Sequence, residues 1–357
     1  MKLLGTVPAR TMKSSAVHFK PGDVLYGRLR PYLNKVYRPS FEGLCSAEFI
    51  VLPENDRVDG GYLQYFLNSS AFVRYASHLN AGDRPRVDFE QLAPYQLPIR
   101  PKHEQRRIVA EIEKQFSRLE EALAIIDTAR GRLTSYRQSV LAAVQTGALC
   151  GLNGNDWPIR AIGDLARSVQ YGSSSNSSAV RDGVPVLRMG NIERGELVLD
   201  DLKYLPADHR EFPTLFLEPG DLLFNRTNSP ELVGKTAVYK GQPKLCSFAS
   251  YLIRVRFGEE AIPEFVAYVL NSPFGRSWVR TVVSQQVGQA NVNGSKLRAF
   301  RMRVPTIAEQ SRLVAEAERH LSLIWKAEFQ LAAAAIRAER LRGSVLANAF
   351  EERFSSD

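Results

Sequence analysis

One eight-residue stretch occurs twice in this chain, as FKPGDVLY at residues 19–26 and as LEPGDLLF at residues 217–224. In both copies Pro-Gly-Asp, which is typical of a tight turn, comes directly before an apolar run that is typical of a β-strand. The stretch therefore predicts the same turn and strand at two places far apart in the sequence. Two similar stretches this far apart in the sequence indicate that a larger structural unit is repeated. Further matches flank both copies.

The matches follow the same order through both halves of the chain. They are LNS at residues 67–69 and 270–272, EQRRIV and EQSRLV at 104–109 and 309–314, and SVLA at 139–142 and 344–347. The offset grows from 198 between Pro21 and Pro219 to 205 between Glu104 and Glu309, and it then stays constant. Small loop insertions followed by a rigid segment explain this drift. The chain is therefore an internal duplication.

The front part of each copy reads as short strands joined by turns. In the second copy we expect strands at residues 184–189, 221–224 and 251–255, where β-branched and aromatic residues are bounded by turn residues. A helical stretch follows at about 263–283, and its counterpart in the first copy lies near 61–79. The front part is therefore expected to mix strands and helices.

The rear part of each copy repeats apolar residues at the 4-3 spacing of a coiled-coil heptad. The repeating positions are Ile112, Phe116, Leu119, Leu123, Ile126, Leu133, Val140 and Val144, and then Ala317, Leu321, Ile324, Glu328, Leu331, Ala338, Val345 and Ala349. Arg130 and Arg137 fill two skipped positions of the first series. Each series predicts a helix of roughly 45 residues, on the order of 65 Å long. We expect the two helices to pair with each other. The alternative is that each lies on its own globular domain.

The composition is that of a basic globular protein. The 357 residues are enough for two or three domains, and 44% of them are hydrophobic. Lys+Arg number 47 against 38 Asp+Glu, and a surplus of +9 attracts a polyanion or an acidic partner. We find no secretory segment and no run of 18 apolar residues, and the three cysteines are far apart. We therefore expect a cytoplasmic protein that does not enter a membrane.

Enzyme signatures do not assemble in this sequence. The stretch NSPF at 271–274 resembles an amino-methyltransferase loop, but its counterpart in the first copy lacks the proline, which favours a helix-end turn. After Asp221, Glu231 and Lys235 are wrongly spaced for a nuclease metal site, and no phosphate-binding loop of the G-x-x-x-x-G-K-[ST] type occurs. Cys45 and Cys246 read as packed core thiols. We expect a chain without catalytic residues, metal or cofactor.

The repeated motifs resemble those of the specificity (S) subunit of type I restriction-modification systems. The second copy carries the pattern most fully, in WPIRAIGDL at residues 157–165, PVLRMGNI at 185–192, EPGDLLFNR at 218–226 and PTIAEQ at 305–310. The last of these resembles the family's helix-entry motif, and the first copy has RPKHEQ at 100–105. The order, spacing and duplication of the motifs are specific, and the resemblance covers nearly the whole chain.

This resemblance implies an α+β protein with two target-recognition domains, which each read one half of a split DNA site. Two long helices in an antiparallel coiled coil join these domains and set the gap between the half-sites. The implied partners are double-stranded DNA and two methyltransferase (M) subunits, and a motor-nuclease (R) subunit can join. The implied division is a first recognition domain at 1–100, a central long helix at 101–150, a second recognition domain at 151–305 and a distal long helix at 306–357.

The first copy departs from the family pattern at its front. About 60 residues, 157–216, stand ahead of the second Pro-Gly-Asp, whereas 20 residues precede Pro21. The counterparts of 157 to roughly 198 are missing, so we expect an N-terminally incomplete first recognition domain whose strands lack partners. A true start further upstream is the alternative. If the first domain is incomplete, the competing function is a coiled-coil assembly scaffold that no longer reads DNA.

Three polar loops of the second copy are expected at the DNA, because base reading needs paired donors and acceptors and phosphate binding needs cations, hydroxyls or amides. Their candidate residues are Tyr171, Ser173, Ser174, Ser175, Asn176, Asn225, Arg226, Asn228, Gln286, Gln289, Asn291, Asn293 and Lys296. In the first copy the corresponding candidates are Arg28, Arg30, Asn34, Lys35, Arg84 and Arg86. The alternatives are a disordered linker for the serines, a turn cap around Asn225, an ordinary polar loop for the amides and solvated charge for the arginines.

Overall fold

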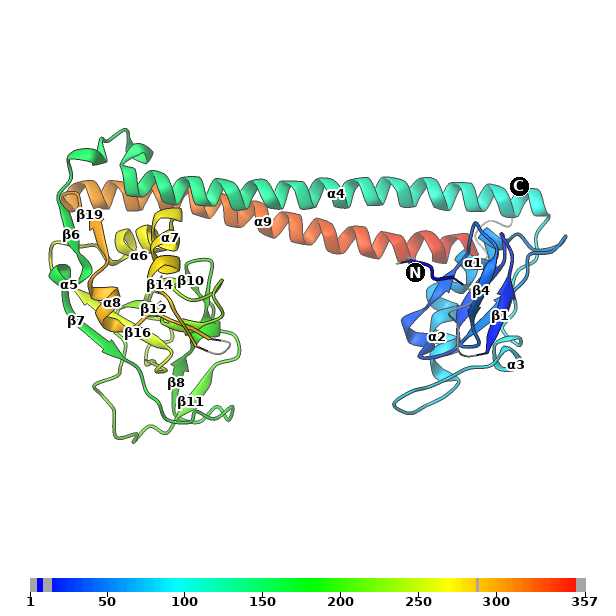
Figure 1. Cartoon of the computed structure of the whole chain (residues 1–357), viewed down its shortest axis with the longest axis horizontal. Coiled ribbons are helices and arrows are strands. Elements are labelled where there is room, and N and C mark those ends of the chain that lie inside the picture. Colours follow the sequence, from blue (N-terminus) through cyan, green and yellow to red (C-terminus); the bar gives the residue numbers. More distant parts are fainter. Residues whose placement is uncertain (1–4, 9–14, 287–288, 351–357) are drawn as a thin grey trace. The chain divides into compact units, whose positions relative to one another are not determined.

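The computed structural model of the chain describes residues 5–8, 15–286 and 289–350. These residues form two compact units, each built around one copy of the repeat. The first unit contains the residues up to 129 together with those from 330 onward, and the second contains residues 130–329. Both long helices cross from one unit into the other, so each unit consists of a strand-rich body and a segment of each helix (Figure 1).

The body of the first unit has five described strands and three short helices. The strands are β1 (Ala16–Phe19), β2 (Val24–Gly27), β3 (Val36–Tyr37), β4 (Gly43–Ser46) and β5 (Phe49–Leu52), and the helices are α1 (Gly60–Leu67), α2 (Ser70–His78) and α3 (Phe89–Leu92). A 3-10 turn spans Pro31–Leu33. The strands form two antiparallel sheets, with the orders β3-β2-β5 and β1-β4.

The body of the second unit is larger and holds several small sheets. Its strands are β6 (Ile159–Ala161), β7 (Ala166–Tyr171), β8 (Val184–Leu187), β9 (Ile192–Glu193), β10 (Glu196–Leu197), β11 (Lys203–Leu205), β12 (Leu222–Asn225), β13 (Thr227–Asn228), β14 (Thr236–Val238), β15 (Ser247–Phe248), β16 (Leu252–Phe257), β17 (Ser284–Gln286), β18 (Gln289–Asn291) and β19 (Arg301–Arg303). Its short helices are α5 (Ile162–Leu165), α6 (Pro263–Asn271), α7 (Pro273–Val282) and α8 (Gly294–Arg298). The central sheet has the order β14-β12-β16-β7.

The repeated Pro-Gly-Asp forms the predicted turn in both units. Gly22 and Gly220 have φ angles of 95° and 93°, a left-handed conformation that suits glycine after proline in a tight turn. The aspartate side chain then closes the turn, because Asp23 Oδ2 accepts from Lys20 N at 2.8 Å and Asp221 makes the equivalent bond. The turn delivers the chain directly into β2 or β12, as the sequence predicts.

The central sheet of the second unit is covered on both faces. Phe224 and Ile253 are opposite each other in register and pack in the core that contains α6, whereas Leu223 and Leu252 face a second core. The second core includes Cys246, and burial raises the pKa of this thiol to about 12, so it is a packing residue as expected. In the first unit the corresponding second cluster is smaller.

The strand order also differs between the units. In the second unit, β16 lies between β12 and β7. In the first unit, the equivalent strand β5 pairs with β2, and within the described residues it has no second sheet neighbour. The first unit is thus a smaller version of the second.

The two rear helices form as predicted, and they pack against each other. Helix α4 spans Lys102–Thr146 and α9 spans Ile307–Phe350, with 45 and 44 residues. In the first unit Ile112 and Phe116 pack with Leu346 and Ala349, near the start of α4 and the end of α9. In the second unit the end of α4 packs with the start of α9. The pairing is therefore antiparallel within each unit, and the two helices lie side by side (Figure 1).

A buried glutamine joins each long helix to the body of its unit. Gln105 Oε1 accepts from Asp59 N at 2.8 Å, and its Nε2 donates to the carbonyls of Arg57 and Arg100. Gln310 makes an equivalent set of three bonds in the second unit. The glutamine of the helix-entry motif therefore has a structural role in both units. It hydrogen-bonds to loop amides and carbonyls that would otherwise be buried without partners at the junction.

Candidate nucleic-acid interface

Arg226 is the centre of a group of polar residues in the second unit. Its amide donates to Tyr251 O and its carbonyl accepts from Val292 N, each at 2.9 Å, so its main chain is fixed on both sides. Its guanidinium carbon lies 4.8 Å from the centre of the Tyr171 ring, which is a cation–π contact. The Tyr171 hydroxyl in turn accepts from Gly294 N at 2.7 Å. Residues from four segments of the chain therefore meet at one place.

Four further candidates lie on β13 and β18 and at the start of α8. Asn291 Nδ2 donates to Thr227 Oγ1 at 3.0 Å, and Asn228 is paired in register with Ala290. Asn293 caps α8, because its Oδ1 accepts from Lys296 N at 2.9 Å. Lys296 Nζ donates to Val282 O and to the Ser284 hydroxyl, so its ammonium group is held in position. Gln286 and Gln289 lie on the paired strands β17 and β18, and their side chains are outside the described part of the structure.

The serine loop is held in place by contacts on both sides. Ser173 is buried, its amide donates to Phe248 O at 2.9 Å and its carbonyl accepts from Ser250 N at 2.7 Å. The Ser173 hydroxyl also hydrogen-bonds to Glu211, and His209 Nε2 is 3.0 Å from the Ser175 hydroxyl. Ser174 and Asn176 are exposed. The loop therefore has an anchored base and a polar, solvent-facing tip, which a free linker would not have.

Asn225 is fully buried, so it does not face solvent with the other candidates. Its Nδ2 donates to Leu232 O at 3.4 Å, and its main chain bonds to Lys235 and Gly234. Its place in the structure is that of a residue that holds the turn after β12. The sequence leaves turn capping open as the alternative for this position, and the hydrogen bonds of Asn225 fit that alternative.

Beneath the site, the sheet of the second unit contains a buried charge network. Arg254, whose side chain is 3% exposed, lies 3.6 Å from Asp221, and Arg256 donates two hydrogen bonds to the same carboxylate. Burial lowers the pKa of Arg254, whereas the Asp221 carboxylate opposes this change. The hydrogen bond to Asp221 raises the pKa of Arg256. Arg256 also lies 3.1 Å from Glu218, so the two arginines are balanced by two carboxylates of the same unit.

The first unit repeats the main-chain frame of Arg226 around Arg28. The Arg28 amide donates to Glu48 O at 2.9 Å and its carbonyl accepts from Val87 N at 3.1 Å. These bonds are equivalent to those of Arg226, because Glu48 and Val87 occupy the positions of Tyr251 and Val292 in the first copy of the repeat. The side chain differs, because the Arg28 guanidinium donates to Asp88 at 2.6 Å and to Val87 O at 3.2 Å. The two arginines therefore occupy equivalent places in the two units.

Three more arginines of the first unit gather beside Arg28, and two candidates lie elsewhere. Arg30 N donates to Pro85 O at 2.7 Å, and residues 29 and 86 form a β-bridge, which brings Arg84 and Arg86 next to the 28–30 segment. Arg86 pairs with Glu48, and Arg84 is exposed. Asn34 instead donates to Asn68 in a cleft beside the long helices, and Lys35 follows it opposite Gly27.

Two residues of the second unit that the sequence did not indicate help to shape the site. Glu211 and His209 are 38 and 34 residues, respectively, from the serines that they contact, and neither lies in a repeated motif. Their own sequence neighbourhood, DHREF at 208–212, carries no periodic signal that distinguishes them from surface residues. Only the fold brings them beneath the serine loop.

The described residues do not group His, Cys, Asp or Glu side chains into a set of three that could hold a metal ion. None of the helices in this part of the chain combines the length and the apolar character needed to cross a bilayer. The chemistry available at the site consists of guanidinium groups, amides, hydroxyls and an aromatic ring. These groups can bind phosphates and base edges.

Comparison with known proteins places this arrangement in a class. No protein-family model matches the chain. A chain in a solved structure of type I R-M complex assembly aligns with a TM-score of 0.79 at 21% identity, over 96% of this chain and 85% of that chain. The HsdS subunit from Thermoanaerobacter tengcongensis aligns with a TM-score of 0.58 at 21% identity, over 94% of this chain and 82% of that one. The fold, with its two long packed helices, is that of type I specificity subunits.

Sequence relatives point to the same class. The type I restriction enzyme EcoKI specificity subunit of Escherichia coli K12 is 26% identical over 87% of this chain and 68% of its own length. The StySPI specificity subunit of Salmonella potsdam is also 26% identical, with the same coverage. The EcoDI specificity subunit of Escherichia coli is 32% identical over 38% of this chain and 31% of its length. The chain thus has the fold of a type I restriction-modification specificity (HsdS) subunit, and over most of its length it is similar in sequence to such subunits.

Proposed function

We propose that this chain is the specificity subunit of a type I restriction-modification complex, which reads a bipartite DNA site and is itself non-catalytic. Each recognition domain reads one half of the site, and the paired helices set the spacing. The first recognition domain is assigned to residues 1–100 and the second to 151–305, with the long helices at 101–150 and 306–357. The chain directs two methyltransferase subunits, and a motor-nuclease subunit joins them, on DNA in the cytoplasm.

The repeated arginine supports DNA reading most directly. Arg28 and Arg226 have the same pair of main-chain bonds in the two units, and each lies beside other candidate residues. A fixed main chain aims a guanidinium group with little loss of entropy, and arginine is the residue that most often reads guanine or binds phosphate. The net charge of +9 favours the approach of DNA. In the second unit Arg226, Tyr171, Asn228, Asn291, Asn293 and the serine loop form the proposed reading surface.

Adenine-methylation mapping in cells that express the chain with its methyltransferase subunit tests this function. We expect a split motif with two specified halves and a fixed gap. Arg226→Ala should relax or abolish the specified bases of one half, and Arg28→Ala those of the other, because each arginine serves one unit. A base contact that is lost costs about 1–3 kcal/mol of discrimination. A phosphate contact that is lost instead weakens binding to all sequences and lowers the salt dependence by about one charge.

Arg167→Ala provides the matched control, because Arg167 is an exposed arginine of the second unit that pairs with Glu259 and is not one of the residues of the proposed surface. The motif should be unchanged in this variant. If only one half of the motif is specified in the parent chain, the first recognition domain does not read DNA. A stable complex with no motif at all would instead favour the coiled-coil scaffold.

A further inference from the structure

The candidate interfaces of the two units share one main-chain register. In the first unit residues 29 and 86 form an antiparallel bridge, and in the second unit residues 227 and 291 pair antiparallel between β13 and β18. This pairing and the equivalent bonds of Arg28 and Arg226 fix which residues correspond. The corresponding pairs are Arg28 and Arg226, Arg30 and Asn228, Glu48 and Tyr251, Arg86 and Asn291, and Asp88 and Asn293. The two surfaces can therefore be compared position by position.

Burial alternates in the same way along the two corresponding segments. The buried positions are Pro85 and Val87 in the first unit, and Ala290 and Val292 in the second. Arg86 lies between the first two and is exposed, and Asn291 lies between the second two and is partly exposed. Because side chains alternate between the faces of an extended segment, Arg86 and Asn291 leave the two bodies on the same side.

The residue types at these positions differ between the units. The first unit has Arg30 and Arg86 where the second has Asn228 and Asn291. A guanidinium group donates two parallel hydrogen bonds, which match the O6 and N7 acceptors of guanine. An asparagine amide donates one and accepts one, which matches N7 and the N6 amino group of adenine. The two surfaces are therefore complementary to different base edges.

Carboxylates hold two arginines of the first surface. Arg28 Nε donates to Val87 O at 3.2 Å, and Arg28 Nη2 donates to Asp88 Oδ1 at 2.6 Å. These bonds engage one edge of the guanidinium group, while Nη1 has no partner among the residues that the structure describes. Arg86 is held in a similar way by Glu48. An arginine fixed on one edge presents its other donors with little loss of entropy on binding.

The backbone of Arg30 is an unusual place for an arginine. Its φ angle is 55°, a left-handed conformation that glycine and asparagine adopt more readily than arginine. A hydrogen bond from Arg30 N to Pro85 O at 2.7 Å helps to hold this conformation. Residues in such conformations cluster at functional sites, so an arginine at this position favours a role for its side chain.

The second surface has neither of these carboxylates. Positions 251 and 293 are tyrosine and asparagine, and within the described residues Arg226 has no ion-pair partner. Asn291 Nδ2 donates to Thr227 Oγ1 at 3.0 Å, which leaves Asn291 Oδ1 and one Nδ2 hydrogen without partners in the part of the chain that is described. A free acceptor beside a free donor is the pair that an adenine edge requires.

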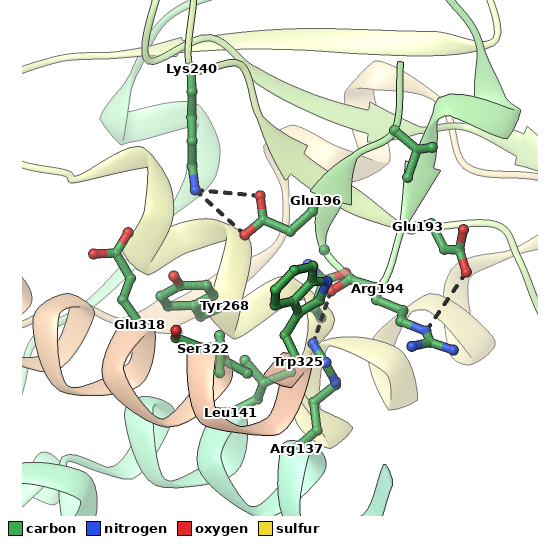
Figure 2. A pocket seen from close by; sticks show the side chains of 14 residues that line it. Arg137, Leu141, Glu193, Arg194, Glu196, Lys240, Tyr268, Glu318, Ser322 and Trp325 are labelled. Carbon is green, nitrogen blue, oxygen red and sulfur yellow. Dashed lines mark hydrogen bonds and ion pairs between the residues drawn. The ribbon is translucent and has the colours of Figure 1, made fainter. Parts of the chain in front are cut away.

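Charged residues in the cleft beside the long helices of the second unit are balanced internally. Lys240 lies 3.4 Å from Glu196, and Arg194 lies 3.7 Å from Glu193 (Figure 2). These cations already have carboxylate partners within the same cleft, so the cleft does not select an anion. Arg226 differs from them, because its guanidinium group contacts an aromatic ring instead of a carboxylate.

We propose that the two units select different bases. The first unit reads guanines through Arg28, Arg30 and Arg86. The second unit reads adenines through Asn228 and Asn291. The inference rests on the proposed function, which supplies the DNA, and it adds the base that each surface selects. The site is therefore asymmetric in composition, with G·C pairs at the contacts of the first unit and A·T pairs at those of the second.

Methylation mapping of the chain with its methyltransferase subunit tests the assignment, with one variant for each contact. Arg28→Ala identifies the half that the first unit reads. Arg30→Asn and Arg86→Ala should each relax a G·C pair in that half, and asparagine suits the left-handed backbone at position 30. Asn228→Ala and Asn291→Ala should each relax an A·T pair in the other half.

Reciprocal exchange of corresponding residues is the sharper test. Arg86→Asn with Glu48→Tyr gives the first unit the residues of the second, and Asn291→Arg with Tyr251→Glu does the reverse. The first exchange should lower the preference for guanine at one position roughly tenfold or more, measured by competition between duplexes that differ in that base pair at fixed salt. The second should replace a preference for adenine by one for guanine. Arg74→Asn, at an exposed arginine of α2 outside the surface, is the matched control and should change neither half.

Asp88 is a positioning residue, because it acts through Arg28. Asp88→Asn keeps the size of the side chain and removes its charge. We expect a weaker preference for guanine at the Arg28 contact, with undiminished affinity for non-specific DNA. A purely structural role would instead lower the melting temperature and weaken binding to all sequences alike.

The outcomes separate this inference from the proposed function. The inference is wrong, and the function stands, if a split motif has no guanines at the contacts of the first unit. It is also wrong if the exchanged variants lose affinity equally for every base, because the residues then bind phosphate. A motif with only one specified half overturns the assignment of a base to each unit. A stable complex that yields no motif contradicts the proposed function itself.

Discussion

Gln310 is a buried side chain whose polar atoms are all engaged. Its Oε1 accepts from Ile262 N at 2.8 Å, and its Nε2 donates to the carbonyls of Glu260 and Pro305. Gln310→Ala would leave an amide and two carbonyls buried without partners. We expect the free energy of unfolding to fall by about 2–4 kcal/mol, measured by urea denaturation. Gln330→Ala, at an exposed position of the same helix, should cost less than about 0.5 kcal/mol. Equal losses in the two variants would contradict this role.

This glutamine recurs in both copies of the repeat, but its structural role could not be predicted from the sequence. The partners of Gln310 include loop residues up to 50 positions earlier in the chain, and no pattern specifies which loop amide a side chain will reach. The same limit applies at the candidate interface. Residue type indicated Arg226 and Tyr171, whereas the burial of Asn225 and the contacts of Glu211 follow only from the packed fold.

At the scale of elements, the helix pair holds two charges at heptad positions where apolar residues are usual. Arg137 and Glu328 have side-chain exposures of 13% and 16%, and they pair with each other across the helices. Arg194, from the body of the second unit, bonds to the same carboxylate. The heptad pattern predicted both helices and identified these positions as exceptions. It could not predict their pairing, because that depends on the antiparallel register.

Glu328→Ala should destabilise the second unit, because Arg137 and Arg194 would lose their shared carboxylate. We expect a loss of about 1–3 kcal/mol in the free energy of unfolding, since a half-buried arginine is left unpaired. The double variant Arg137→Leu with Glu328→Leu should recover most of this loss, because apolar residues then fill the seam. Glu259→Ala removes an exposed ion pair with Arg167 and should cost under about 1 kcal/mol. A double variant that is no more stable than Glu328→Ala would refute the explanation.

At the scale of the whole molecule, the helix pair is proposed to set the gap between the half-sites. Deleting one heptad from each helix, residues 123–129 of α4 and 330–336 of α9, keeps the phase of the facing positions. Each helix becomes shorter by about 10 Å, which corresponds to about three base pairs of DNA. We expect the methylation motif to keep both half-sites and to lose about three unspecified positions between them. A motif with unchanged spacing would exclude the helices as the determinant of the gap.

The packing of Phe350 has a consequence for the order in which the two units form during synthesis. Its ring lies 5.1 Å from that of Tyr62 and 5.6 Å from that of Phe66, so the first unit includes a residue that leaves the ribosome almost 290 positions later. The second unit is one continuous stretch of chain, residues 130–329. Because domains fold as units while the chain emerges, the second unit can be complete while the first still waits for its last helical turns. The body that is translated first is therefore finished last, and until then its aromatic core is open to chaperones and proteases.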